Sequence, residues 1–130
     1  MDAGSDTHET VAEAVRARAV AYAEALWRGD AVALEGIFHP AAHLYASQDG
    51  ALIDWPRAQF LDRVAARSPG EGPAEYTIRE VSVVGPEMAH VALDVAVPER
   101  RFTDYLNFLM LDGEWRVIAK IFRVAEGPKV

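Results

Sequence analysis

The sequence predicts an α+β domain, in which helices from the N-terminal half pack against one face of a curved antiparallel sheet. Two observations carry this prediction. Apolar residues recur at helical spacing early in the chain, and they alternate with polar residues from about residue 75 onward. A glycine- and proline-rich stretch, Ser68–Pro73, separates the two patterns and is too short to link two domains. We therefore expect residues 1–130 to form a single domain, with a core of about 8–124 and flexible ends.

The first part of the chain has the pattern of two helices. An apolar stripe along the first helix consists of Val11, Val15, Ala19, Tyr22 and Leu26. Gly29 is expected to end this helix, and Asp30 to cap a short second one that ends before Pro40. The buried residues of the second helix are expected to be Leu34, Ile37 and Phe38.

A hairpin and a third helix follow. The sequence predicts a short strand over His43–Ser47, a tight turn at Asp49–Gly50 and a returning strand over Ala51–Ile53. Asp54 is a candidate cap for the third helix, with Pro56 in its first turn. The buried face of that helix is expected to be Phe60, Leu61 and Val64.

The second half of the chain predicts four strands in a meander. Their expected ranges are Glu75–Val84, Ala89–Val97, Arg101–Leu111 and Glu114–Val124. If Asp112–Gly113 is a two-residue turn, Leu111 lies opposite Glu114, and Tyr105 then lies opposite Lys120. Asp104 falls on the apolar row in this register, so either it pairs with an arginine at an interface or the register slips by one.

One row of this sheet is apolar and the other is mixed. In the strand Ala89–Val97, the mixed row holds His90 and Asp94 between alanines. From the pattern alone, His90, Asp94 and Lys120 are as compatible with a solvated face as with a functional one. The apolar row consists of Val91, Leu93, Val95, Leu106, Phe108, Val117 and Ala119.

The composition excludes several classes of function. Hydrophobic residues make up 51% and charged residues 25%, which is typical of a folded globular domain. The net charge of -7 argues against a nucleic-acid partner, and the lack of a long apolar run argues against a membrane partner. Without a secretory leader, we expect a cytoplasmic protein. The chain has no cysteine, and its four histidines are not paired on one element, so we expect no metal and no cofactor.

Two segments resemble a known family. Phe102–Leu106 and Asp112–Phe122, which reads Asp-Gly-Glu-Trp-Arg-Val-Ile-Ala-Lys-Ile-Phe, are similar to the signature of the Putative lumazine-binding family. That family belongs to the nuclear transport factor two-like superfamily, with the SnoaL-like cyclases and ketosteroid isomerase. The resemblance implies a cone: a strongly curved, mostly antiparallel sheet wrapped around three N-terminal helices, with an internal pocket. It also implies a homodimer through the outer sheet face, for which the apolar row is the expected surface.

The resemblance also assigns candidate site residues. Tyr22 falls where ketosteroid isomerase has its oxyanion-binding tyrosine, and Asn107 where it has a protonated aspartate. Ala46 replaces the general-base aspartate, so that isomerase reaction is not expected here. The candidate catalytic residues are Tyr22, Asp94, His90 and Lys120, and the candidate ligand-binding residues are Asn107, Tyr105, Phe38, Trp55, Phe60 and Phe122.

Each candidate also has a structural interpretation. Tyr22 lies on the buried helix stripe, where most tyrosines are core residues. Asp94 and Lys120 are expected to pair inside the cone beneath Tyr22, either as a structural ion pair or as acid and base.

The expected function is the binding of a small molecule in the pocket. One hypothesis is a metal-independent acid–base enzyme of lyase, isomerase or cyclase type, acting on a small apolar carbonyl or heterocyclic compound. The alternatives are a non-catalytic protein that binds a small ligand and a dimerisation module.

Overall fold

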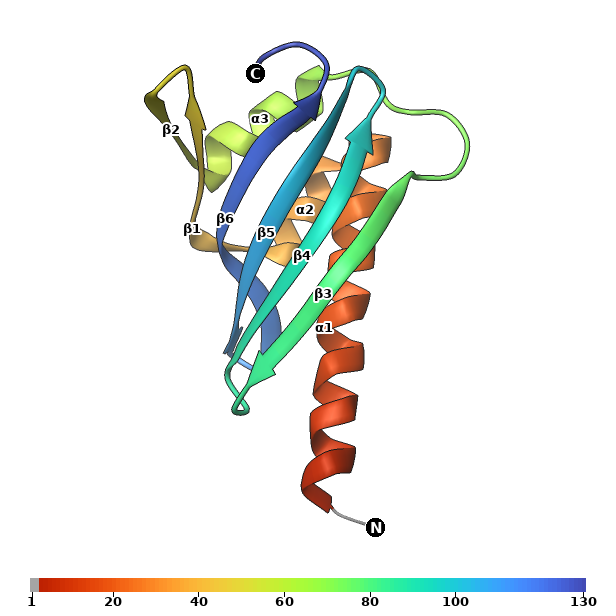
Figure 1. Ribbon diagram of the computed structural model, residues 1–130, viewed down its shortest axis with the longest axis vertical. Helices are drawn as coiled ribbons and strands as arrows, with labels where there is room; N and C mark the ends of the chain where they lie inside the picture. Colours follow the sequence, from red (N-terminus) through yellow and green to blue (C-terminus); the bar gives the residue numbers. More distant parts are fainter. Residues whose placement is uncertain (1–2) are drawn as a thin grey trace.

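The computed structural model describes residues 3–130, with side chains from residue 10 onward, and its helices cover one face of an open sheet (Figure 1). The helices are α1 (Ala3–Arg28), α2 (Ala31–Ile37) and α3 (Arg57–Ala66). The strands are β1 (Phe38–Gln48), β2 (Ala51–Pro56), β3 (Tyr76–Val84), β4 (Met88–Val97), β5 (Arg100–Leu111) and β6 (Glu114–Glu126). This arrangement confirms the predicted α+β class.

The sheet has the order β2-β1-β6-β5-β4-β3 and is mostly antiparallel. Only β1 and β6, among the described strands, pair in parallel. The sheet is not closed, and it wraps the helices as the cone that the family resemblance implies (Figure 1). No helix among residues 3–130 is long and apolar enough to span a membrane.

The helix α1 packs beneath the sheet through the predicted stripe. Val15, Ala19 and Tyr22 on this stripe are fully buried. Gly29 ends the helix in the left-handed region, with φ of 68°. Asp30 then caps α2 by accepting a hydrogen bond from the Ala33 backbone at 3.0 Å. The two helix boundaries predicted from Gly29 and Asp30 are therefore confirmed.

The first hairpin is longer than predicted. Phe38 begins β1 instead of ending α2, and the strand continues through Pro40. Pairing with β6, which begins at Phe38 opposite Val117, explains this extension. Asp54 lies within β2 and contacts His43 at 2.6 Å, so it does not cap α3. Both predicted two-residue turns are confirmed, because Asp49–Gly50 and Asp112–Gly113 have positive φ throughout.

The register between β5 and β6 changes at one extra residue. Near the turn Phe108 lies opposite Val117, as predicted, but Ile118 has no partner in β5. Beyond this bulge Leu106 lies opposite Lys120. The predicted pairing of Tyr105 with Lys120 is therefore wrong, because a one-residue shift moves every later side chain to the other face.

The bulge decides which residues of β6 beyond Ile118 face the helices, and so brings Lys120 to the same side as Asp104. Asp104 and Lys120 are both buried, whereas Tyr105 is exposed on the outer face. The apolar row that was expected to form a dimer surface is buried inside instead, with Val91, Leu93, Leu106 and Val117 fully inaccessible. That expectation about the outer face is wrong for these residues.

Two irregular segments are held by side chains. The backbone carbonyl of Trp27 accepts a hydrogen bond from the Gly70 backbone N–H at 2.8 Å, and the Trp27 indole N–H donates to the Gly72 carbonyl at 3.1 Å. These two bonds anchor Ser68–Pro73. After β6 the chain is bound by Arg100, which donates to the carbonyls of Pro128 and Lys129.

Candidate functional site

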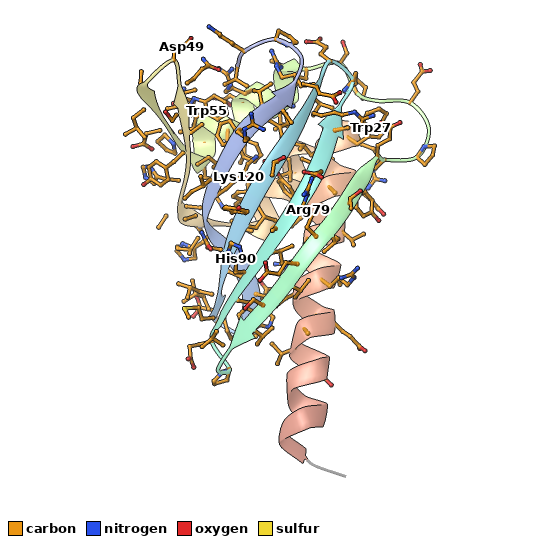
Figure 2. All side chains as sticks on the ribbon, viewed as in Figure 1. Trp27, Asp49, Trp55, Arg79, His90 and Lys120 are labelled. Atoms are coloured by element: carbon orange, nitrogen blue, oxygen red, sulfur yellow. The ribbon has the colours of Figure 1, made fainter. Side chains whose placement is uncertain are left out.

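A cavity of about 240 Å³ lies between α3, β2 and the adjoining part of β5 and β6. Trp55 and Lys120 line it, and both lie in the half of the sheet nearest α3 (Figure 2). Its other lining residues are Leu26, Phe60, Arg63, Ala66, Arg67, Arg100, Phe102, Phe122 and Val130. The lining is therefore aromatic and cationic.

Three polar side chains meet beneath this cavity. Lys120 donates a hydrogen bond from Nζ to the Tyr22 hydroxyl at 2.7 Å. Tyr22 donates to Oδ2 of Asp104, and the same carboxylate oxygen lies 3.5 Å from the Lys120 amine. Lys120 is 3% exposed, and the other two are fully buried. Of the three, only Lys120 lines the cavity.

Burial controls the protonation of this triad. It lowers the pKa of Lys120, against the opposing effect of the Asp104 charge, and it raises the pKa of Asp104. It also raises the pKa of Tyr22 well above its usual value, so the phenol keeps its proton. The lowered pKa of Lys120 and the raised pKa of Asp104 lie closer together than in water, which favours proton exchange between the two groups. Tyr22 is hydrogen-bonded to both and lies between them.

Aromatic rings surround the Lys120 amine. Its Nζ lies 5.0 Å from the ring centroids of Phe60 and Phe122, and 5.2 Å from that of Tyr22. The negative faces of such rings attract a cation, which partly offsets the loss of water. The same rings give a bound ligand an apolar surface.

Three arginines complete the lining, Arg63, Arg67 and Arg100, and none of them is among the site residues predicted from the sequence. Arg63 stacks over Trp55, with its Cζ 4.2 Å from the ring. Arg67 has a buried Nη1 with no hydrogen-bond partner. A signal was available, because Phe60, Arg63 and Arg67 lie three and four residues apart and share one face of a helix.

The structure brings together part of the predicted set. Lys120, Trp55, Phe60 and Phe122 line the cavity, and Tyr22 lies beneath it. Phe38 is buried against the rings of Tyr22 and Phe60 and does not line the cavity.

The predicted pairing of Asp94 with Lys120 is wrong. Asp94 accepts hydrogen bonds from Arg79 at 2.7 Å and from Thr103 at 2.8 Å, on the outer face. The hydrogen bond from Arg79 lowers the pKa of Asp94. The partner of Lys120 is instead Asp104, which lies on the same face of β5 as Leu106, and the bulge in β6 carries Lys120 to that inner face.

The remaining candidates form a separate group on the outer face. His90 Nδ1 lies 2.8 Å from Asn107 Oδ1, and the His90 ring lies 5.2 Å from that of Tyr105. Asn107, which falls at the position of the isomerase's protonated aspartate, therefore does not lie beside Tyr22, where the acid is Asp104. No group of three or more His, Asp or Glu residues that could hold a metal occurs among the residues that the structure describes.

Comparisons with known proteins agree on the fold and the family. The family profile described as Putative lumazine-binding matches residues 10–123. A protein named Aldolase FrzH, from Cladobotryum sp., is 31% identical over 112 residues, which cover 85% of this chain and 88% of that protein.

Solved structures give the same result. An NTF-2 like protein of unknown function from Silicibacter pomeroyi is 30% identical, with a TM-score of 0.81 over 91% of this chain and 98% of that one. A ketosteroid isomerase-like protein from Erwinia carotovora atroseptica shares the fold at 15% identity, with a TM-score of 0.67 over 88% of this chain and 95% of that one. The chain belongs to the Putative lumazine-binding family, within the NTF2-like superfamily.

Proposed function

We propose that the protein is a lyase of the aldolase type, which makes or breaks a carbon–carbon bond beside the carbonyl group of a small, largely apolar compound. One observation carries this proposal: the buried amine of Lys120 lines an aromatic cavity and is hydrogen-bonded to Tyr22. A lysine amine held in an apolar pocket is a known type of nucleophile toward carbonyl compounds. The related protein named an aldolase supports the choice of reaction.

The triad can produce a neutral amine without changing its net charge. The Lys120 ammonium group passes a proton to the Tyr22 oxygen, while Tyr22 passes its own proton to Asp104. An ion pair thereby becomes a neutral amine beside a neutral carboxylic acid. Because no charge is left alone in the interior, the large cost of an isolated buried ion is avoided.

The neutral amine then adds to the carbonyl carbon of the substrate. The carbonyl oxygen takes one proton from the attacking nitrogen and one from the Asp104 acid by way of Tyr22, and it leaves as water. A protonated imine then stands on Lys120, and Asp104 is ionised again. In the cleavage direction, a hydroxyl on the β-carbon gives its proton to the Asp104 carboxylate by way of Tyr22 and becomes a carbonyl group as the adjoining carbon–carbon bond breaks. The electron pair of that bond forms an enamine with the iminium group. Protonation of the enamine carbon and addition of water release Lys120, and the reverse sequence forms the bond.

Reductive trapping tests the nucleophile. The protein is incubated with 3-phenylpropanal and sodium cyanoborohydride, which converts an imine into a stable secondary amine, and the label is located by mass spectrometry. The chain has two lysines, so the exposed Lys129 is an internal control. We expect preferential labelling of Lys120 and slower labelling in Tyr22→Phe. Labelling of Lys129 without Lys120 would contradict the proposal.

Turnover is tested separately with 4-hydroxy-4-phenylbutan-2-one, whose cleavage releases benzaldehyde and acetone. We expect benzaldehyde release that is lost in Lys120→Met and kept in Lys129→Met. Binding of the compound without any release would instead favour the non-catalytic alternative.

We also propose a homodimer through the outer sheet face. The support is a pair of large apolar side chains exposed there, Tyr105 and Ile121, which pair across β5 and β6.

A further inference from the structure

The charge of the cavity lining is opposite to that of the chain. The chain carries 20 acidic residues and a net charge of -7. The cavity is nevertheless lined by Arg63, Arg67, Arg100 and Lys120, with no Asp or Glu side chain among its lining residues. A concave site with one sign of charge concentrates ligands of the opposite sign.

These cations are not equally available to a ligand. Lys120 is paired with Asp104. Arg100 donates hydrogen bonds from Nε to the Pro128 carbonyl and from Nη2 to the Lys129 carbonyl. Arg63 is spread over the ring of Trp55. Arg67 remains, and its Nη1 is buried without a hydrogen-bond partner.

An unpartnered guanidinium nitrogen is an unusual feature of a protein interior. Arginine keeps its charge in proteins, so Arg67 cannot escape the cost of burial by losing a proton. Burial lowers the pKa of Arg67, and the charges of Arg100 and Arg63 lower it further. An anionic acceptor in the cavity would satisfy the free N–H group and reduce this repulsion.

The apolar residues of the lining indicate the chemistry and the size of the rest of the ligand. Trp55, Phe60, Phe102 and Phe122 provide aromatic surface, and Leu26 adds an aliphatic one. The volume of about 240 Å³ is below the range of pockets for drug-sized molecules, so the occupant is small.

We propose that Arg67 binds a carboxylate group, and that the compound taken by this cavity is a small oxo acid with an aromatic or branched apolar body. The proposal of a carboxylate group is supported by Arg67 and the cationic lining. The proposal of an oxo group rests on the proposed function of Lys120. Arg67 and Lys120 line the same cavity of about 240 Å³, so one small molecule in it can meet both groups.

The test compares two probes that differ in charge and scarcely in shape, 3-phenylpropionate and 3-phenylpropionamide. Neither has a reactive carbonyl group, so their binding does not depend on catalysis. By calorimetry at low salt, we expect the carboxylate to bind the wild-type protein at least about tenfold more tightly than the amide. This preference should decrease as salt is added.

Matched variants then locate the preference. Arg67→Met should bring the two affinities close together, and Arg67→Lys should keep part of the difference. Arg123→Met removes the same charge from an exposed position on β6 and should leave the preference unchanged. Thermal melts establish that each variant is folded. The wild-type comparison needs no variant, so it remains decisive if Arg67→Met does not fold.

The outcomes separate this inference from the proposed function. Equal binding of the two probes by the wild-type protein overturns the carboxylate site, as does binding of neither at millimolar concentration. A preference that survives in folded Arg67→Met also overturns it. A clear carboxylate preference without imine labelling of Lys120 supports the carboxylate site and contradicts the proposed function alone.

Discussion

Lys120 and Asp104 depend on each other for their buried positions. Each is an ionisable group almost wholly removed from water, and the Tyr22 hydroxyl joins them. An ion pair in the interior gains little net stability, but loss of one partner leaves a charge without compensation. The same contacts that serve the proposed chemistry therefore make the fold sensitive to substitution here.

We expect Lys120→Met to lower the free energy of unfolding by about 3–5 kcal/mol at neutral pH. The double variant Asp104→Leu, Lys120→Met should cost much less, because no charge remains buried. Asp94→Asn is the control, since Asp94 is partly exposed on the outer face, and it should cost about 1 kcal/mol or less. Chemical denaturation measures all three, and additive losses in the double variant would contradict the coupling.

The deficit of Lys120→Met should depend on pH. Without the Lys120 charge that lowers it, the pKa of Asp104 in the folded protein rises further above its value in the unfolded chain. The folded state then binds a proton more readily. The variant should therefore recover stability as pH falls toward about 3.9, the unfolded pKa, and lose it as pH rises through the folded pKa. Denaturation curves across this range measure the effect.

Asp104 should also set the pH at which Lys120 reacts. Its negative charge raises the pKa of Lys120, so Asp104→Asn should lower that pKa further. The neutral amine then appears at lower pH, and the midpoint of reductive labelling should move in the acidic direction. Asp94→Asn should leave the midpoint unchanged. A shift toward higher pH would show that Asp104 does not act on the amine through its charge.

At the scale of elements, local chemistry made much of the fold predictable. Asp-Gly pairs adopt the positive φ of two-residue hairpins, and Gly29 and Asp30 satisfy the ends of adjoining helices. These features depend on a few neighbouring residues. The stripe on α1 was predictable for the same reason, because its spacing follows the helical period.

The extra residue in β6 was not predictable in this way. Ile118 is a typical strand residue, and nothing beside it marks a bulge. A register extended from the turn at Asp112 is correct as far as Val117 and inverted beyond it. Asp104 on the apolar row was the one visible conflict, and it is resolved by the slip of one residue.

The loop anchored on Trp27 gives a prediction for backbone packing. A Cβ atom on Gly70 would lie 2.2 Å from Cε2 of the Trp27 ring, so Gly70→Ala must displace the indole. We expect a loss of about 1–3 kcal/mol in the free energy of unfolding. Gly36→Ala is the control, because a Cβ there meets nothing within 4 Å and alanine favours the helix α2. Equal stability of Gly70→Ala and the wild-type protein would contradict this packing.

At the scale of the whole molecule, the two faces of the sheet have different tasks. The inner face carries the core and the cavity, and the outer face carries Tyr105 and Ile121 in contact with solvent. The fold was predictable as a whole because family and pattern agreed. The site was predictable only in part, since its charged residues depend on which face each strand position takes.

We expect light scattering at micromolar concentration to give twice the mass of one chain. Ile121→Asp should yield a folded monomer, because the side chain is 52% exposed in the single chain and does not belong to its core. Phe108→Asp is not a test of the interface, since Phe108 is buried in the core and its substitution would unfold the protein. A monomeric wild-type protein would contradict the dimer.

The bulge at Ile118 also affects how function is transferred between relatives. Trp115 and Lys120 are an odd number of positions apart, yet both face inward, which is possible only because a residue between them is unpaired. In a homologue without that insertion, the aligned lysine would lie on the opposite side of its strand. An alignment gap at this one position therefore distinguishes homologues that inherit the amine in the cavity from those that carry it in solvent.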